Sequence, residues 1–147
     1  MISRILVATD SSPSSKRALE AAIDLALKYK ASLHIIQVIS DTQMPEEIRT
    51  MAEVASKEDE DKDVLTTVAE RILNEAKLEA EKVGINEVEI SVGEGDPATI
   101  IVDTAHQLAV DLVVLGTRGL SQVKSLLMGS VSQKVSNLAD VNCLIVR

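Results

Sequence analysis

The sequence contains no tryptophan and no phenylalanine, and Tyr29 is its single tyrosine. A ring-shaped ligand would find almost no aromatic side chain on which to stack, because Tyr29 falls at the expected end of a helix. Cys143 is the only cysteine, which excludes an internal disulfide and a cysteine-based metal site. Its apolar surroundings, NCLIVR, are typical of a buried and unreactive thiol.

Long apolar runs and basic clusters are absent as well. No run approaches the roughly 18 residues that a membrane span requires, and the opening MISRILVATD lacks the pattern of a cleavable signal peptide. With 23 acidic and 15 basic residues the formal net charge is −8, which repels nucleic-acid phosphates and anionic lipid surfaces. We therefore expect a cytoplasmic protein that binds neither nucleic acid nor membranes.

The composition that remains is that of an ordinary globular protein. Hydrophobic residues make up 46% of the 147 residues and charged residues 26%. A chain of this length buries one substantial core. No internal repeat or low-complexity linker divides it, so we expect a single domain over residues 1–147.

Strand and helix patterns alternate along the chain. Apolar runs rich in Ile, Leu and Val predict strands, and amphipathic segments preceded by capping residues or proline predict helices. The strands are expected over 2–9, 32–40, 88–92, 111–116 and 142–147, and the helices over about 16–30, 64–83, 97–109 and 130–139. The alternation predicts a doubly wound α/β domain, which is a Rossmann-like parallel sheet with helices on both faces.

The region between the second and third strands is the least regular. Residues 41–63 are charged and lack a periodic apolar pattern, so we expect a solvated, partly helical excursion. Beyond it, a helical apolar spacing predicts the buried face of the long second helix. The residues of that spacing are Leu65, Val68, Ile72, Ala76 and Val83. Gly84 follows where a helix end favours a left-handed residue.

A ligand is expected at one particular edge of this sheet. In doubly wound folds, ligands bind beyond the carboxyl ends of the strands, where the strand order reverses. If the order is 3-2-1-4-5, the reversal falls between the first and fourth strands. Asp10 ends the first strand and Gly116 ends the fourth, so the two residues are expected to face each other across this crevice.

The stretch GTRGLSQVKSLLMGSV places three glycines after the fourth strand, in the spacing Gly116-x2-Gly119-x9-Gly129-Ser130. Glycines let main-chain amides approach an anion without an intervening Cβ. The last helix then begins with unpaired amides, and the Ser130 hydroxyl either caps it or donates to a phosphate oxygen. This pattern predicts a phosphorylated ligand. The alternative, a tight turn and nothing more, is common for glycines after a strand.

Other phosphate-binding motifs are missing. The chain has neither a G-x-G-x-x-G sequence after the first strand nor a G-x4-G-K-[ST] sequence. Dehydrogenases and P-loop enzymes are therefore poor fits.

Three segments together resemble the universal stress protein family over essentially the whole chain: RILVATDSS, EGDPATIIVDTAHQLAVDLVVLGTRG, and GSVSQKV followed by CLIVR. The resemblance implies an adenine-nucleotide-binding domain, usually a homodimer, with sheet order 3-2-1-4-5. Members with the full glycine pattern are typically ATP binders, and this chain keeps all of it. The one departure is Ser11, where many members have glycine, and it affects the shape of that turn.

The resemblance also implies roles for individual positions. Thr9 and Asp10 would lie beside adenine and ribose, and the backbone around Val38 would read the adenine edge. The residues that would hold ribose and phosphates are Gly116, Gly119, Gly129, Ser130, Val131 and Ser132. Arg118 is a further candidate for pairing with a phosphate, although the family pattern does not fix it.

The expected ligand is ATP, or AMP or ADP, with Mg²⁺ bridging the phosphates. Because aromatic residues are nearly absent, adenine would be enclosed by aliphatic side chains and read by backbone hydrogen bonds. We expect a stress or regulatory protein that works by binding. Two alternatives remain: a slow ATP hydrolase on the same fold, and a nucleotide-free dimeric interaction module, against which the intact glycine pattern argues.

No catalytic residue is assigned. A catalytic base and a transition-state cation at suitable spacing are not identifiable, and neither His34 nor His106 has ligand-type or triad-type neighbours in sequence. We therefore expect at most weak ATP hydrolysis. The apolar final strand would form a sheet edge, and its pairing with the same strand of a second copy about a two-fold axis predicts a homodimer.

Overall fold

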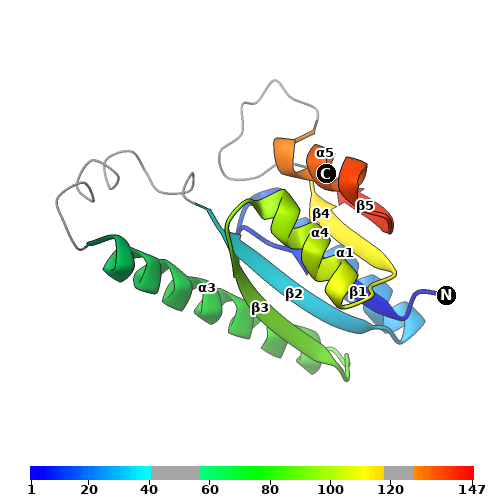
Figure 1. Cartoon of the computed structure of the whole chain (residues 1–147). Helices are drawn as coiled ribbons and strands as arrows, with labels where there is room; N and C mark the ends of the chain where they lie inside the picture. The colour runs from blue at the N-terminus through cyan, green and yellow to red at the C-terminus, as the bar shows by residue number, and fades with distance from the viewer. Residues whose placement is uncertain (41–56, 118–127) are drawn as a thin grey trace.

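Five parallel strands form one sheet in the order β3-β2-β1-β4-β5 (Figure 1). The computed structural model describes residues 1–40, 57–117 and 128–147. The elements are β1 (Arg4–Ala8), α1 (Pro13–Tyr29), β2 (Ser32–Ile39), α3 (Lys57–Lys82), β3 (Val88–Glu94), α4 (Pro97–Gln107), β4 (Leu112–Gly116), α5 (Ser130–Leu138) and β5 (Asn142–Val146). The predicted doubly wound class and strand order are confirmed.

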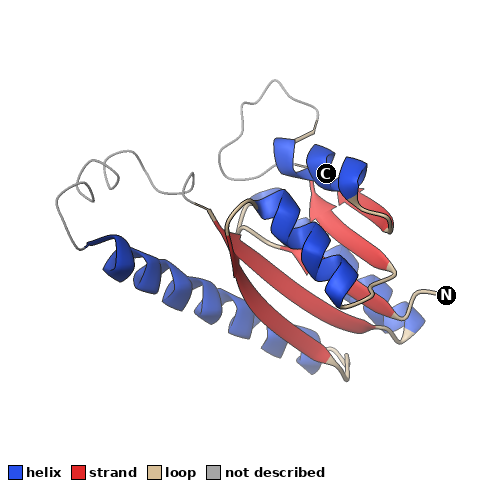
Figure 2. Ribbon diagram, in the orientation of Figure 1, coloured by secondary structure: helices blue, strands red, loops and turns tan. Residues whose placement is uncertain are grey.

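The helices cover both faces of this sheet (Figure 2). α1 and α3 pack on one face, and α4 and α5 pack on the other. Along β1 the side chains alternate between the two layers: Ile5 and Val7 contact the α1/α3 layer, whereas Leu6 contacts the α4/α5 layer. Strands buried on both faces read as continuous apolar runs, which is why the sequence located them.

α4 begins where its capping signal predicts, whereas α1 begins at Pro13, ahead of the expected start near residue 16. Ser12 caps α1 and Asp96 caps α4, and each cap is followed by a proline at the first helical position. The Asp96 carboxylate accepts a hydrogen bond from the Thr99 amide at 3.0 Å. Such caps satisfy amides that have no partner within the helix. After the carboxyl end of α3, Gly84 adopts a φ of +112°, a positive value of the kind predicted.

α3 differs from its prediction in its start and in its buried face. It begins at Lys57 and so includes part of the charged stretch, of which 41–56 lies outside the described residues. Val68 and Val83, predicted to be buried, are 50% and 51% exposed. The buried residues are Ala69, Leu73, Ala76 and Ala80. Ala76 is buried as predicted, but Val68 and Val83 were predicted wrongly because the pattern gave weight to large apolar residues, whereas small alanines bring this helix close to the sheet.

β5 forms one edge of the sheet and is less buried than the central strands. Its residues are exposed or half-buried, and Leu144 is 37% exposed. β4, by contrast, has four fully covered residues followed by Gly116. Within the described ranges, no helix is long and apolar enough to cross a lipid bilayer.

Candidate functional site

The carboxyl ends of β1 and β4 lie side by side at the point where the strand order reverses. The two strands are direct neighbours, with Val7 opposite Val114. β1 leads into the turn that starts α1, and β4 leads through Gly116 to Thr117. The predicted neighbourhood of the Asp10 and Gly116 segments is therefore present in the fold.

The start of α5 is attached to the end of β4. The Ser132 hydroxyl donates to the Gly116 carbonyl at 2.9 Å and contacts the Thr117 carbonyl oxygen at 3.2 Å. The Gly129 amide also donates to the Thr117 carbonyl. Three of the predicted site segments thus converge at one edge of the sheet. Arg118 and Gly119 lie outside the described residues.

Gly129 occupies the N-cap position of α5, with a φ of −71°, and among the described residues no side chain caps this helix. Ser130 is the first helical residue, so its hydroxyl does not occupy the predicted capping position. Its donation to a ligand stays a prediction. The amides of Ser130, Val131 and Ser132 have no acceptor within the helix, because the first turn of any α-helix lacks them. α5 therefore presents an uncapped, partially positive end beside β4.

The turn after β1 is held by its own side chains. The Asp10 carboxylate accepts a hydrogen bond from the Ser12 amide at 2.9 Å, and the Thr9 hydroxyl lies 3.3 Å from the Ser15 hydroxyl. Asp10 therefore has the turn-stabilising role that is common for aspartate after a strand. Ser11 adopts a φ of +66°, which is a conformation that favours glycine.

Hydroxyl groups dominate the buried polar side chains of this edge. In the part of the chain that the structure describes, the buried polar residues all carry a hydroxyl and stand at or near the carboxyl ends of β1, β2 and β4 or at the starts of α1 and α5. They are Thr9, Ser12, Ser14, Ser15, Ser40, Thr117 and Ser132. Sequence reasoning singled out only Thr9 and Ser132 among them, although the strings SSPSS and GTR contained the signal.

Two further polar atoms of this region lack partners. The Ser11 hydroxyl oxygen and the Gln37 amide oxygen are buried and make no hydrogen bond within the described ranges. Gln37 belongs to β2 and follows Ile36, the residue whose carbonyl accepts from the Thr9 amide at 2.9 Å. Buried polar atoms without partners are rare in folded proteins and call for a specific explanation.

Val38 is a core residue of the α4/α5 layer and is only 5% exposed. The β1–β2 register ends at the Ala8–Ile36 pair, whereas the β2–β3 register continues to Glu94. The main chain of Val38 therefore extends beyond the end of β1. The predicted role of its backbone at the crevice stays a prediction.

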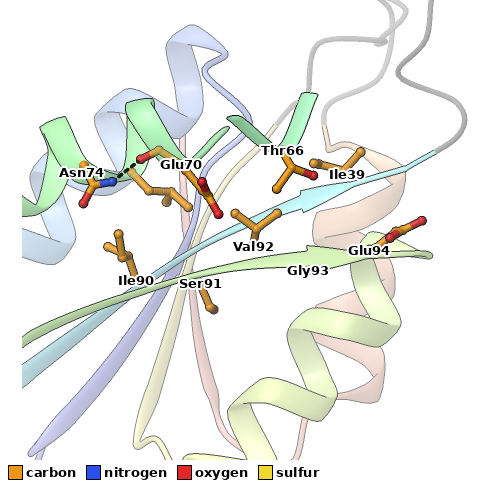
Figure 3. A pocket seen from close by; sticks show the side chains of 10 residues that line it. Ile39, Thr66, Glu70, Asn74, Ile90, Ser91, Val92, Gly93 and Glu94 are labelled. Carbon is orange, nitrogen blue, oxygen red and sulfur yellow. Dashed lines mark hydrogen bonds between the residues drawn. The ribbon is translucent and has the colours of Figure 1, made fainter. Parts of the chain in front are cut away.

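A separate cavity of about 510 Å³ lies between α3 and the ends of β2 and β3 (Figure 3). Leu73, Ile90 and Val92 contribute apolar surface to it, and Glu70 and Glu94 contribute carboxylates. Figure 3 shows the Glu70 side chain directed from α3 toward β3. Two carboxylates disfavour an anionic ligand, so the cavity is a poor site for a phosphorylated molecule, and it includes none of the predicted site residues.

The histidines and the cysteine take no part in this edge. His34 Nε2 lies 2.7 Å from the Ser91 hydroxyl, across the β2–β3 pair, and burial lowers the pKa of His34. His106 lies on α4, 3.6 Å from the Asp140 carboxylate. Cys143 is half-buried, and that burial raises the pKa of its thiol. The His34–Ser91 contact joins residues far apart in sequence, so neighbouring residues gave no signal for it.

Comparison with known proteins identifies the family of this chain. The family model described as the universal stress protein family matches residues 1–147. The universal stress protein YxiE of Bacillus subtilis is 35% identical over 100% of both chains. The solved structure of the hypothetical protein MJ0577 superposes with a TM-score of 0.84 at 29% identity, covering 99% of this chain and 96% of that one.

A third relative was solved with a ligand. It is a universal stress protein in complex with cAMP, with a TM-score of 0.68 and 28% identity over 99% of this chain and 97% of the other. The parallel sheet with helices on both faces and a donor-rich carboxyl edge defines a Rossmann-like α/β protein. The chain belongs to the universal stress protein family.

Proposed function

We propose that this protein binds an adenine nucleotide, with ATP as the expected ligand, at the edge where β1 and β4 end. The observation that carries the proposal is the convergence of the β1 turn, the end of β4 and the uncapped start of α5, which Ser132 fastens to Gly116. Uncharged donors gathered at a strand-order reversal are suited to a phosphorylated ligand.

The phosphates would lie against the first turn of α5. The amides of Ser130, Val131 and Ser132 point out of the helix start, and the helix dipole favours negative charge there. Gly129 contributes no side chain that would fill the space in front of them. Gly119 and Arg118, which lie outside the described residues, are also proposed to contact the phosphates.

The nucleoside would lie at the ends of β1 and β2. Thr9 and Asp10 follow β1, and the main chain of Val38 extends past the last β1–β2 pair. The ring would be enclosed by aliphatic groups, because the chain has no Trp and no Phe. The universal stress protein solved with cAMP supports an adenine nucleotide as the class of ligand.

Mg²⁺ would enter with the phosphates. In residues 1–40, 57–117 and 128–147, no group of three or more His, Cys, Asp or Glu side chains is placed to hold a metal ion. A cation that accompanies ATP is therefore expected to take most of its ligands from phosphate and water.

The first experiment identifies what the purified protein carries. The protein is denatured, and its small molecules are separated and identified by mass spectrometry. Recovered ATP supports the proposal, and ADP together with measurable turnover supports the slow hydrolase. A protein that yields no nucleotide and shows no heat of binding with millimolar Mg·ATP contradicts the proposal and leaves the interaction module.

The second experiment places the ligand. Gly129→Val puts a branched side chain in front of the α5 amides at a φ of −71°, which valine adopts without strain. We expect calorimetric affinity for Mg·ATP to fall by at least about 100-fold, since phosphate contacts are lost. Ser136→Val, on the exposed side of the same helix, is the matched control. Equal affinities in both variants would defeat the assignment of the phosphates to α5.

We propose in addition that two copies pair through β5. The strand is a half-buried apolar edge, and apolar edges of this kind pair readily. Leu144→Lys places a charge on it and is expected to convert the dimer into a monomer in sedimentation experiments at protein concentrations too low for weaker contacts to form. Ser136→Lys, which adds the same charge on α5, should leave the dimer intact. A dimer that persists in Leu144→Lys would contradict pairing at this edge.

A further inference from the structure

The face of α3 that points away from the sheet carries apolar side chains. Val64, Val68 and Leu78 are 61%, 50% and 66% exposed. At about 100° per residue, they lie on the side of the helix opposite Leu73 and the three alanines that contact the sheet. The outward side of α3 therefore carries apolar side chains that the sheet does not cover.

These residues belong to a regular stripe. Its positions are separated alternately by four and three residues, as in the seam of a coiled coil. The outer stripe consists of Val64, Val68, Arg71, Glu75, Leu78 and Lys82. Scattered exposed apolar residues are normal on protein surfaces, whereas a heptad-like seam is the pattern of a helix that packs against another helix.

The outer stripe is complementary to itself when reversed. We propose that two copies of this chain associate through their α3 helices, packed antiparallel, with the two-fold axis crossing the outer stripe midway between Arg71 and Glu75. In this arrangement Val68 of one copy meets Leu78 of the second copy, and the reverse contact follows by symmetry. Val64 meets the aliphatic stem of Lys82, whose ammonium group reaches solvent.

The charges at the centre of the stripe fix the direction of pairing. Arg71 Nε lies 3.3 Å from Glu75 Oε1 within one helix, and the two side chains are 82% and 68% exposed. In the antiparallel pair, Arg71 also faces Glu75 of the second copy, and the contact occurs twice. A parallel pair would instead place Arg71 against Arg71 and Glu75 against Glu75, which is unfavourable.

The position of α3 leaves the other edge of the sheet accessible. α3 packs beside β3 and β2, whereas β5 is the last strand at the opposite edge (Figure 1). The stripe from Val64 to Lys82 is about 27 Å long and one helix wide. Interfaces of this size are at the weak end of the range, so the association is reversible and depends on concentration.

The first test is sedimentation equilibrium of the full chain from about 10 to about 500 µM, the range that suits so small an interface. We expect the mean mass of the wild-type protein to rise with concentration. Val68→Glu should weaken this association by about tenfold or more, since it buries a charge in the seam. Val83→Glu is the matched control, because Val83 is equally exposed at 51% and lies off the stripe.

A wild-type protein whose mass does not rise with concentration would overturn the proposal. Equal association of Val68→Glu, Val83→Glu and the wild-type protein would overturn it as well. Circular dichroism of each variant checks that α3 remains helical, so that a lost association can be distinguished from unfolding of the chain.

The second test depends on mixing. Arg71→Glu places two acidic groups on the stripe, and Glu75→Arg places two basic groups there, so each variant alone should associate about tenfold more weakly than the wild-type protein. An equimolar mixture should recover the association, because each acidic stripe then faces a basic one. Mixing cannot repair an ion pair within one chain. Failure of the mixture to recover would overturn the antiparallel contact.

Discussion

The backbone of Gly116 lies against the first turn of α1, so closely that a Cβ at residue 116 would come within 2.6 Å of the Ser14 hydroxyl oxygen. The same Cβ would lie 2.7 Å from the Ser14 carbonyl carbon and 2.8 Å from the Ser15 amide nitrogen. Glycine is therefore required here by packing alone. The first glycine of the predicted phosphate pattern thus has a structural role before any ligand is considered.

Gly116→Ala should destabilise the fold. The clashing atoms include backbone, which yields less readily than the tip of a side chain, so we expect the free energy of unfolding to fall by about 1–3 kcal/mol. Urea denaturation followed by circular dichroism measures the change. Gly129→Ala, at an ordinary φ of −71°, should cost less. Equal stability of Gly116→Ala and the wild-type protein would show that the α1 turn moves freely.

Ser11→Gly should stabilise the fold. Ser11 adopts a φ of +66°, and a non-glycine residue in the left-handed region costs about 1–2 kcal/mol. Part of that gain is offset because glycine is more flexible in the unfolded chain. Lys30→Gly, at a φ of +55° after α1, is the control and should gain a similar amount. A lower denaturation midpoint for Ser11→Gly alone would indicate that the buried Ser11 hydroxyl stabilises the turn.

Stability should depend on pH through His34. Burial lowers the pKa of His34 below its ordinary value of 6.5, and the charge of Glu89 opposes this effect. The unfolded chain therefore binds the proton more readily than the folded chain does. The stability that the neutral His34 side chain contributes is fully present above pH 6.5. The free energy of unfolding falls as the pH drops below that value.

His34→Gln should remove this dependence, because glutamine retains a polar group for the Ser91 hydroxyl and does not titrate. Urea midpoints at a series of pH values from neutral to mildly acidic give the comparison. His106→Gln, on the exposed side of α4, is the matched control and should keep the wild-type slope. A slope that is unchanged in His34→Gln would assign the dependence to other groups.

Asp96 connects two helices and should contribute to stability down to low pH. Three hydrogen bonds lower the pKa of Asp96 from 3.8 to about 2. They come from the Thr99 hydroxyl, from Lys134 and from the Thr99 amide. Lys134 reaches it from α5 at 2.9 Å. The charged form is therefore favoured in the folded protein, and its contribution is present above pH 3.8 and is lost as the pH falls toward about 2.

Asp96→Asn keeps an N-cap and removes the charge, so its stability should differ from that of the wild-type protein above pH 3.8 and converge with it on acidification. Asp96→Ala removes the cap too and should cost about 1 kcal/mol more. Thermal unfolding of the variants over this pH range makes the measurement. A constant difference between Asp96→Asn and the wild-type protein would contradict a role for the carboxylate charge.

The positions of the strands and the start of α4 could be predicted because their causes are local, whereas the strand order was implied by the resemblance to the universal stress protein family. Continuous apolar runs mark strands buried on both faces, and Asp96 followed by Pro97 marks the start of a helix. The buried face of α3 was not predictable in the same way. Ala69 and Ala80 are buried because the sheet lies close to them, and their small size gives little signal in an amphipathic pattern.

The candidate site could be predicted at the level of segments. The fold class brings the ends of β1 and β4 together, so Asp10 and Gly116 were expected near each other before any contact was known. The contacts themselves depend on three-dimensional approach. The close packing of Gly116 on Ser14 and the pairing of His34 with Ser91 join residues from different elements, and no local pattern encodes such a contact.

The clustering of hydroxyl groups at the carboxyl edge of the sheet has a consequence for the pH dependence of anion binding. Serine and threonine side chains neither gain nor lose a proton between mildly acidic and mildly alkaline conditions, and main-chain amides do not either. Donors of this kind keep a constant charge where histidine would switch and lysine would be strongly hydrated. An anion held by hydroxyl and amide donors would be bound with nearly the same affinity when the solution becomes acidic, provided that the ionisation of the anion itself does not change.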